Sequence, residues 1–256
     1  MPTNPEAARL YAEGLEKLRR YDALAAKELL ERATRLEPGY PLAHAELSSA
    51  WSRLGYEGKE REEAQRAFQL SKNLSREERL RIEGRYWRAL QRRDKAVEMY
   101  QALWNFFPDN LEHGLGLASA QTSAGKAKEA LATVEALQKL PAPLRDDPRI
   151  DLAEATASNV LGDYRWGQAA AGRAAAKAAV LGAQSLLADA RASEGVALHY
   201  LGELDKALAA QEEAKGIYAA QGNRAGLALM SSNIGNVHYG RGDLAGAKKM
   251  YEEALA

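Results

Sequence analysis

The stretch EERLRIEGRYWRALQRRDKAVEMYQALWNFFPDN, residues 77–110, decides the fold through the spacing of its small, aromatic and helix-breaking residues. Gly84 and Ala96 are its eighth and twentieth residues, and small side chains there let two antiparallel helices approach closely. Tyr100, the twenty-fourth residue, fills the space beside the pair, and Pro108, the thirty-second, stops the second helix because proline lacks a backbone N–H. The stretch therefore predicts a helix–turn–helix unit.

The same spacing of small, aromatic and helix-breaking residues recurs along the chain and predicts seven units in one continuous solenoid. Residues 1–143 are expected to hold four units, namely 7–40, 41–76, 77–110 and 111–143. Residues 144–256 are expected to hold three longer units, namely 148–187, 188–227 and 228–256, the last one truncated.

Two glycine patterns set the expected loops. Gly162, Gly202 and Gly242 are spaced 40 residues apart, which predicts long repeats that keep the first helix and add about six residues to the second and its connection. Gly55 and Gly58 predict a loop with four extra residues between the two helices of the second unit.

This spacing resembles the tetratricopeptide repeat (TPR), a helix–turn–helix unit with the same small, aromatic and proline positions. The resemblance implies an all-α, right-handed TPR superhelix, an α-α solenoid of about seven helical hairpins whose first helices line a concave groove. Four shorter repeats followed by longer ones are similar to the TPR regions of bacterial serine/threonine kinases and winged-helix transcription regulators. The sequence holds no Gly-rich loop, HRD or DFG motif of a kinase.

Composition excludes several classes of function. Lys+Arg and Asp+Glu both number 35, so no global field favours nucleic acid or a membrane. The absence of Cys excludes disulfides, thiolate metal sites and Cys nucleophiles, and it fits a reducing cytoplasm. The start, MPTNPEAARL, lacks an apolar signal-peptide core, and no run approaches the ~18 apolar residues of a membrane span. We expect a cytoplasmic protein without cofactor or enzymatic activity.

The resemblance also implies which side chains face the groove, through the second, fifth, ninth, twelfth and thirteenth positions of each repeat. The groove residues expected in this way are Arg81, Arg85, Arg88, Ser119, Thr122, Asn159, His199, Tyr200, Asn236 and Tyr239, together with Tyr11 and Arg53 among others. Such polar and aromatic side chains can hydrogen-bond an extended peptide backbone. A solvated helix face without a ligand is the other reading.

Arginines form the sharpest local feature. Arg81, Arg85, Arg88 and Arg92 are spaced four, three and four apart, which predicts one helical face, and residues 76–95 hold eight basic and four acidic side chains. These guanidinium groups could bind carboxylates or phosphates bidentately, or they could pair with Glu of neighbouring helices. The leading hypothesis is a non-enzymatic protein- or peptide-binding scaffold in a larger bacterial regulatory protein. The alternative is an enzyme-linked regulatory module that binds a small acidic or phosphorylated ligand at this stripe.

Weaker signals leave alternatives open. Position seven of four repeats holds a glutamate (Glu13, Glu83, Glu154 and Glu194). Each is either solvent-exposed at the groove edge or partly buried with an Arg or Tyr partner. Asn236 matches one position of the Lys/Asn carboxylate clamp of chaperone-binding TPR proteins, but Ser232 stands where Lys is needed. His199 and His238 lack an acidic third ligand, so no metal site is predicted.

The last helix carries apolar side chains that nothing later in the sequence covers. These side chains are Leu244, Ala247, Met250, Tyr251, Ala254 and Leu255. A terminal repeat needs a polar capping face. We therefore expect either a longer protein or a homodimer that meets through this uncapped C-terminal helix.

Overall fold

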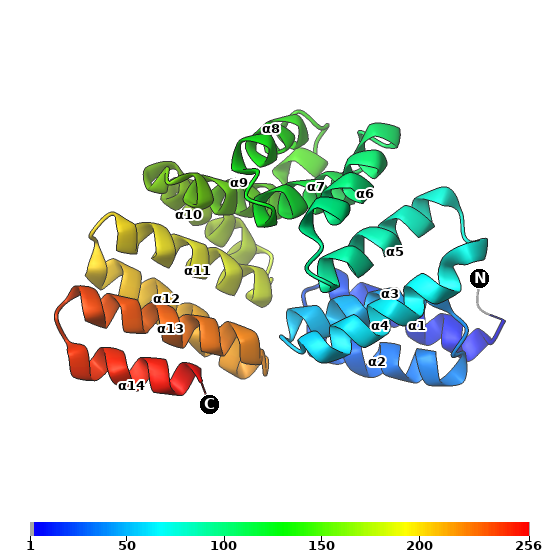
Figure 1. The fold of residues 1–256 in the computed structure, drawn as a ribbon, viewed down its shortest axis with the longest axis horizontal. Helices are drawn as coiled ribbons and strands as arrows, with labels where there is room; N and C mark the ends of the chain where they lie inside the picture. The colour runs from blue at the N-terminus through cyan, green and yellow to red at the C-terminus, as the bar shows by residue number, and fades with distance from the viewer. Residues whose placement is uncertain (1–2, 256) are drawn as a thin grey trace. The chain divides into compact units, whose positions relative to one another are not determined.

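The computed structural model describes residues 3–255, which are helical almost throughout and contain no strand (Figure 1). Within these residues, fourteen α-helices follow one another, which confirms the predicted all-α solenoid architecture. Six consecutive pairs pack as hairpins, namely α1–α2, α3–α4, α5–α6, α9–α10, α11–α12 and α13–α14. The α-helices are α1 (Pro5–Arg19), α2 (Ala23–Leu36), α3 (Pro41–Arg53), α4 (Glu57–Leu70), α5 (Arg76–Ala89), α6 (Arg93–Phe106), α7 (Leu111–Ser123), α8 (Ala127–Gln138), α9 (Pro148–Leu161), α10 (Tyr164–Val180), α11 (Gln184–Tyr200), α12 (Leu204–Ala220), α13 (Arg224–Gly240) and α14 (Leu244–Ala254). Two short 3-10 helices, η1 (Ser71–Asn73) and η2 (Leu144–Asp146), lie in connections.

The chain forms two compact units, one up to Ala120 and one from Gln121 onward. The first unit holds α1 to α6 and most of α7, and its first helices α1, α3 and α5 contact one another in sequence. The second unit holds α8 to α14, in which α9, α11 and α13 make the same kind of contact. Each unit therefore has an inner layer built from the first helices of successive hairpins.

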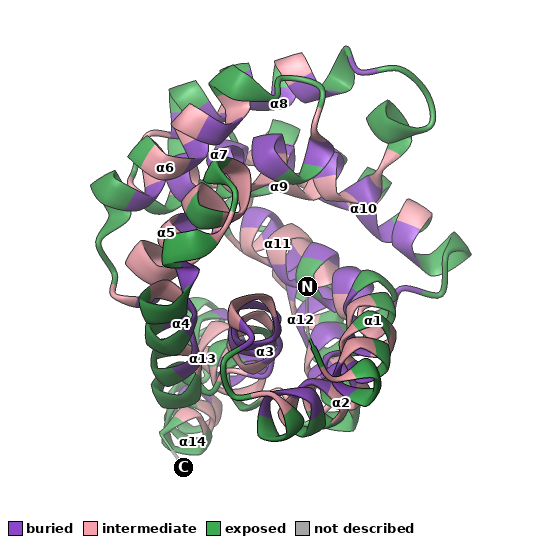
Figure 2. Cartoon of the chain, turned by 90° about the vertical axis from the view of Figure 1, so that its right-hand side faces the viewer, coloured by how far each residue is buried: buried purple, intermediate pink, exposed green. Residues whose placement is uncertain are grey.

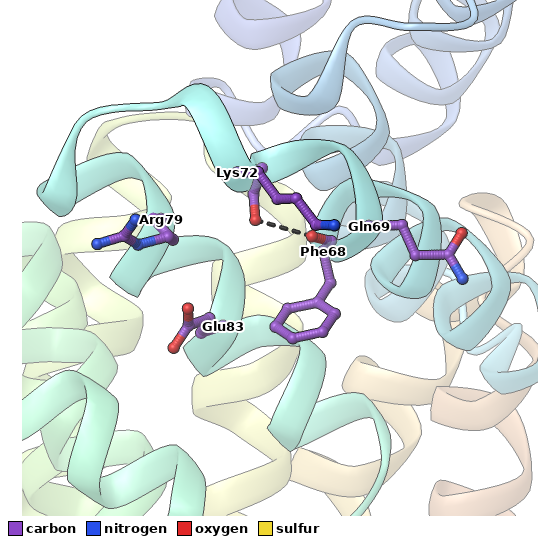
Figure 3. Close-up of a pocket in the computed structure, with 6 residues that line it drawn as sticks. Phe68, Gln69, Lys72, Arg79 and Glu83 are labelled. Atoms are coloured by element: carbon purple, nitrogen blue, oxygen red, sulfur yellow. Dashed lines mark hydrogen bonds between the residues drawn. The ribbon is translucent and has the colours of Figure 1, made fainter.

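The second hairpin corrects a prediction from the sequence. The turn between α3 and α4 has three residues around Gly55, whose φ of 79° closes it tightly, and Gly58 lies inside α4. The extra residues of this repeat come after α4, as the 3-10 helix η1, to which Lys72 in Figure 3 belongs. The expected loop between the helices was wrong because one left-handed glycine suffices for the turn. The glutamates that follow favour helix from Glu57 onward.

The long repeats are confirmed in one respect and corrected in another. The second helices α10 and α12 have 17 residues each, against 14 in α2, α4 and α6. The first helices α11 and α13 also have 17 residues, so the expectation that the first helix keeps its length was wrong. Antiparallel neighbours lengthen together because extra turns at the end of α10 lie beside extra turns at the start of α11. Ala178 and Leu186, near these two ends, are both buried.

From Gly162 onward, the left-handed glycines of the second unit recur every 20 residues. Their positions are Gly162, Gly182, Gly202, Gly222 and Gly242. Gly162 begins a two-residue turn, and each of the other four sits in the middle of a three-residue turn between two helices. A φ between 63° and 88° at these positions favours glycine because it has no Cβ. The second unit is thus built on a helix-and-turn half-repeat.

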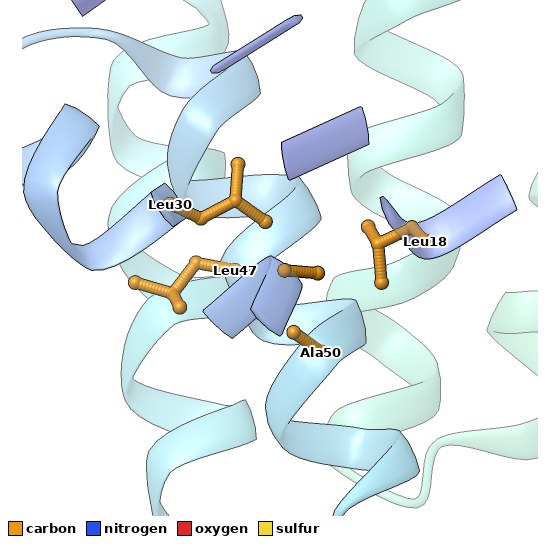
Figure 4. Packing of buried hydrophobic residues seen from close by; sticks show 5 residues of the cluster. Leu18, Leu30, Leu47 and Ala50 are labelled. Carbon is orange, nitrogen blue, oxygen red and sulfur yellow. The ribbon is translucent and has the colours of Figure 1, made fainter. Parts of the chain in front are cut away.

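Small and large side chains alternate between neighbouring helices. In the first unit Leu18, Leu30, Leu47 and Ala50 pack together from three successive helices (Figure 4). Each helix buries one side and leaves the other exposed, as the burial colours of Figure 2 show. A Cβ on Gly226 would lie 2.6 Å from the Tyr218 ring, so helix α13 approaches α12 through this glycine.

Candidate functional site

The inner layer of the first unit contains a buried carboxylate among arginines. Glu46, on α3, is 5% exposed, and its Oε1 accepts a hydrogen bond of 2.8 Å from Nη1 of Arg85 on α5. Burial raises the pKa of the Glu46 carboxyl, but Arg85, Arg81 and Arg53 together lower it further, so the net shift is downward. Glu46 is therefore ionised at neutral pH and lies in the positive field of three guanidinium groups.

The three arginines have different partners. Arg85 also donates to the Ala45 carbonyl at 3.2 Å, and its pKa is raised because Glu46 outweighs the lowering effect of burial. Arg53 donates to the Leu18 carbonyl at 3.0 Å. The Nε of Arg81 is buried and has no hydrogen-bond partner within residues 3–255. A buried donor without a partner is costly, so Arg81 has a hydrogen-bond donor that no residue of the described part of the chain uses.

Tyrosines complete this surface on the α1 side. Tyr11, on α1, packs edge-on against Tyr40 with ring centroids 5.0 Å apart. Burial and then Glu46 raise the pKa of Tyr11, and Arg81 and Arg85 lower it, which places Tyr11 near all three groups. We name Tyr11, Glu46, Arg53, Arg81 and Arg85 the inner cluster. It offers guanidinium groups and a neutral phenol, which suit a carboxylate or phosphate ligand.

The arginine stripe differs from its prediction at one end. Helix α5 ends at Ala89, and Arg92 is the N-cap of α6, so the expectation of four arginines on one helical face was wrong for Arg92. Gln91, with a φ of 58°, turns the chain between the two helices. Nη2 of Arg88 lies 3.8 Å from Glu60 Oε1. Arg85 and Arg88 thus pair with glutamates of α3 and α4, and Arg81 forms no such pair.

The remaining predicted groove residues divide into engaged and exposed side chains. Asn159 donates to the Ser193 carbonyl at 2.9 Å, and Asn236 accepts from the Tyr251 hydroxyl at 2.8 Å. Tyr200 is 62% exposed and Tyr239 is 66% exposed. The asparagines hold neighbouring helices together, although Asn236 itself is exposed. Both tyrosines are exposed, but the Tyr200 ring also stacks on the Tyr164 ring, with centroids 4.4 Å apart.

Three further groove candidates lie in different surroundings. His199 packs edge-on against Tyr200, with ring centroids 5.4 Å apart. Ser119 is exposed on α7, and Thr122 is partly buried near the end of the same helix. As groove residues, His199, Ser119 and Thr122 stay predictions.

Among the position-seven glutamates, one is exposed and another is buried with partners, so both alternatives occur. Glu13 lies half in solvent and pairs with Arg9 at 2.6 Å. Glu154 is buried, and its oxygens accept hydrogen bonds from Arg173 Nη2 at 2.6 Å and Trp166 Nε1 at 2.7 Å. The recurrence of Glu at this position therefore has no single cause.

Glu154 belongs to a charge network between α9 and α10. Arg173 Nε donates to Asp151 Oδ1 at 2.8 Å, and Lys177 Nζ donates to Asp151 Oδ2 at 2.7 Å. With Trp166 and Arg173 on Glu154, all four carboxylate oxygens have a donor. We name Asp151, Glu154, Trp166, Arg173 and Lys177 the α9–α10 network. Two acids meet two bases there, so the network stabilises the helix pair and has no charge left for a ligand.

The sequence analysis missed Glu46, although a signal was present. It is the one acidic residue in LAHAELSSAW, residues 42–51, where the other side chains are mostly small or apolar. A charge in such a helix face is expected to be buried with a partner. The partner, Arg85, lies 39 residues later, and only the packing of α5 on α3 brings it close.

Two classes of site find no support. Within residues 3–255 no helix is both long and apolar enough to cross a membrane. The same residues contain no group of three or more His, Cys, Asp or Glu side chains that could hold a metal ion.

Comparisons with known proteins point to one architecture. No protein-family model matches the chain, and no curated protein sequence matches it either. Among solved structures, the APC/C hetero-tetramer Cut9–Hcn1 is similar with a TM-score of 0.74 and 12% identity, over 96% of this chain and 45% of that one. The Rap protein complexed with Competence and Sporulation Factor is similar with a TM-score of 0.73 and 13% identity, over 98% of this chain and 76% of that one.

A third similar structure is itself a tetratricopeptide repeat protein. It comes from Parabacteroides merdae and is similar with a TM-score of 0.59 and 16% identity, over 98% of this chain and 93% of that one. At such low identity a likeness establishes the fold alone. The chain therefore has the fold of a TPR-like solenoid of paired helices.

Proposed function

We propose that this protein is a non-enzymatic interaction scaffold that binds an acidic, extended segment of a partner protein on the inner layer of its first unit. The observation that carries the proposal is the inner cluster, in which three guanidinium groups surround one carboxylate and Arg81 is left without a bonded partner. An extended segment can bring one carboxylate to Arg81 and use its backbone for further hydrogen bonds.

Two similar structures support this class of function. Both the Rap protein and Cut9 have a TPR-like solenoid and were solved in complexes, with Competence and Sporulation Factor and with Hcn1 respectively. By analogy we place this chain in a larger regulatory protein of the bacterial cytoplasm. The absence of cysteine is compatible with that compartment.

The alternative ligand is a small acidic or phosphorylated molecule at the arginines of α5. It is favoured by the same surplus of positive charge, because Arg81 and Arg88 can turn toward a compact anion. It is disfavoured by Glu46, which already neutralises Arg85 and would repel a dianion. Each carboxylate of a peptide carries a single charge and is repelled less strongly by Glu46 than a dianion is.

Fluorescence polarisation of a labelled ten-residue peptide of alternating Glu and Ser tests the proposal. The double substitution Arg81→Glu with Arg88→Glu should weaken binding more than about tenfold, since each charge-assisted hydrogen bond contributes about 1.5–3 kcal/mol. Arg35→Glu, at an exposed position of α2, is the matched control and should have a smaller effect. Unchanged affinity in the double variant, with the fold intact, would reject the proposal. Displacement of the peptide by inorganic phosphate at equal concentration would favour the alternative.

The last helix gives a separate proposal about assembly. Leu244 is 65% exposed and Leu255 is 89% exposed on or beside α14. We propose that these side chains contact a further helix or a second copy of the chain. If a second copy covers them, light scattering across a concentration series should show a dimer. A monomer at every concentration would reject the second copy.

A further inference from the structure

A hollow of about 370 Å³ opens between the end of α4 and α5, within the first unit (Figure 3). Its lining residues are Phe68, Gln69, Ser71, Lys72, Arg79 and Glu83. We call it the α4–α5 hollow. Figure 3 shows Arg79 and Glu83 on one side of it and Phe68, Gln69 and Lys72 on the other.

The turn η1 shapes this hollow. Ser71 and Lys72 belong to η1, the insertion that lengthens the second repeat. The Ser71 hydroxyl donates to the Phe68 carbonyl at 2.8 Å, and Leu74 packs against the buried cluster that includes Ala67 and Ile82. These contacts hold both ends of the turn, so the backbone that carries Lys72 has a defined position in the fold.

The hollow is separate from the inner cluster although both use α5. Successive residues of a helix are turned by about 100°. Arg79 and Glu83 therefore lie on one face of α5, and Arg81 and Arg85 lie on nearly the opposite one. A ligand in the hollow would not touch Arg81.

The rim carries charges without partners. Lys72 and Arg79 form no ion pair or side-chain hydrogen bond with any residue in the described part of the chain, and both are exposed. Glu83 follows Arg79 by four residues, the usual spacing for a helical ion pair, yet no such pair forms. Two positive charges and one negative charge therefore face the hollow, which favours a singly charged anion over a phosphate dianion.

The floor is apolar and rigid. The Phe68 ring lies parallel to the Tyr86 ring, with centroids 4.4 Å apart and 6° between their planes. Tyr86 in turn packs against Trp87 at 4.9 Å. Such stacking fixes the Phe68 ring, which is only partly buried and can receive an apolar side chain.

We propose that the α4–α5 hollow binds a second segment of a partner protein, in which an acidic residue stands beside an apolar one. The carboxylate lies between Lys72 and Arg79, and the apolar side chain lies on Phe68. A volume of about 370 Å³ is near the lower end for small-molecule sites. Because Gln69, Lys72 and Arg79 in its lining are exposed, an isolated metabolite would stay largely hydrated there, whereas a protein segment adds contacts along α4 and α5.

A phage-displayed library of random 12-residue peptides, selected on the full chain, tests this proposal. Counter-selection on the Lys72→Ala/Arg79→Ala variant removes peptides that bind elsewhere. The enriched sequences should hold Asp or Glu next to a Leu, Ile, Val or Phe. A synthesised peptide should lose at least about tenfold in affinity in the double variant, and Glu83→Gln should retain or increase its affinity.

Matched variants separate this site from the inner cluster. Arg81→Ala should leave the affinity of the selected peptide unchanged, and circular dichroism should show the same helix content in all variants. Enrichment of basic sequences, or of none that depends on Lys72 and Arg79, would overturn the proposal. So would an equal loss of affinity in Arg81→Ala. Displacement of the peptide by glutarate at equal concentration would also overturn it, because the site would then take a small dicarboxylate.

Discussion

Buried carboxylates occur in both units, but their counter-charges differ. In the inner cluster of the first unit one carboxylate, Glu46, is surrounded by three guanidinium groups. In the α9–α10 network of the second unit two carboxylates meet Arg173 and Lys177, and every carboxylate oxygen has a donor. A balanced network can only stabilise the fold, whereas a surplus of one charge can also bind a ligand of the opposite charge.

The two units also differ in whether their arginines have hydrogen-bond partners. The buried Nε of Arg81 has no hydrogen-bond partner in the described part of the chain. In the second unit the guanidinium of Arg173 spans both acids and is committed to them. The comparison leads us to place binding in the first unit and stabilisation in the second.

The largest expected effect is on stability, in the second unit. Arg173→Met should lower the free energy of unfolding by about 2–3 kcal/mol, because both buried carboxylates lose a charged donor. Arg165→Met, on the exposed side of the same helix, should change it by less than about 0.5 kcal/mol. Urea denaturation followed by circular dichroism measures both. Equal effects of the two substitutions would show that the network does not stabilise this unit.

A smaller effect is expected from close helix packing in the second unit. In Gly226→Ala the new Cβ would lie 2.6 Å from the Tyr218 ring, so overpacking of about 1–3 kcal/mol should outweigh a helix-propensity gain of about 1 kcal/mol. Gly216→Ala, where nothing lies within 4 Å of the new Cβ, should instead stabilise the protein. Thermal unfolding of both variants tests the opposite signs.

The Gly226→Ala and Gly216→Ala variants also test whether the peptide binds to the first unit. Neither substitution should change the affinity of the acidic Glu–Ser peptide for the first unit. Loss of peptide binding in Gly226→Ala, at a temperature where the variant is folded, would contradict the assignment of binding to the inner cluster.

The smallest expected effect is on the pH dependence of stability. Because the folded pKa of Glu46 lies below its unfolded value, this carboxyl contributes stability that is present above about pH 4.5 and is lost as the pH falls through the folded pKa. Glu46→Gln should therefore lose less stability than the wild type between pH 6 and pH 3. Urea midpoints across this range measure the difference. Parallel curves for the two proteins would show that Glu46 is not stabilised in its ionised form.

Much of the fold could be predicted from the sequence because the residues that define each repeat act within a single hairpin. Gly84, Ala96, Tyr100 and Pro108 each have a reason within one hairpin, and Tyr100 does lie against Gly84 in the structure. The two errors concerned where added residues go. In the second repeat they form η1, and in the long repeats they are shared between both helices, because neighbouring helices have to cover each other's apolar faces.

The candidate site could be predicted only in part, since its charge balance depends on contacts distant in sequence. The arginine spacing located Arg81 and Arg85. Whether each was paired depended on Glu46, which comes from another hairpin. Similarly, Asn159 and Asn236 fit a groove pattern, but hydrogen bonds to neighbouring helices occupy them. Spacing places a residue on a face and does not determine its partner.

The most direct test compares the same substitution in both units. Glu46→Gln and Glu154→Gln each replace a buried carboxylate by an amide of the same shape, and fluorescence polarisation measures the affinity of the acidic Glu–Ser peptide at low and moderate salt. Glu46→Gln should bind the peptide about threefold tighter or more, with a gain that shrinks as salt rises, because three guanidinium groups then lack their counter-charge. Glu154→Gln should leave the affinity unchanged. Weaker or equal binding by Glu46→Gln, or an equal gain in Glu154→Gln, would contradict the account.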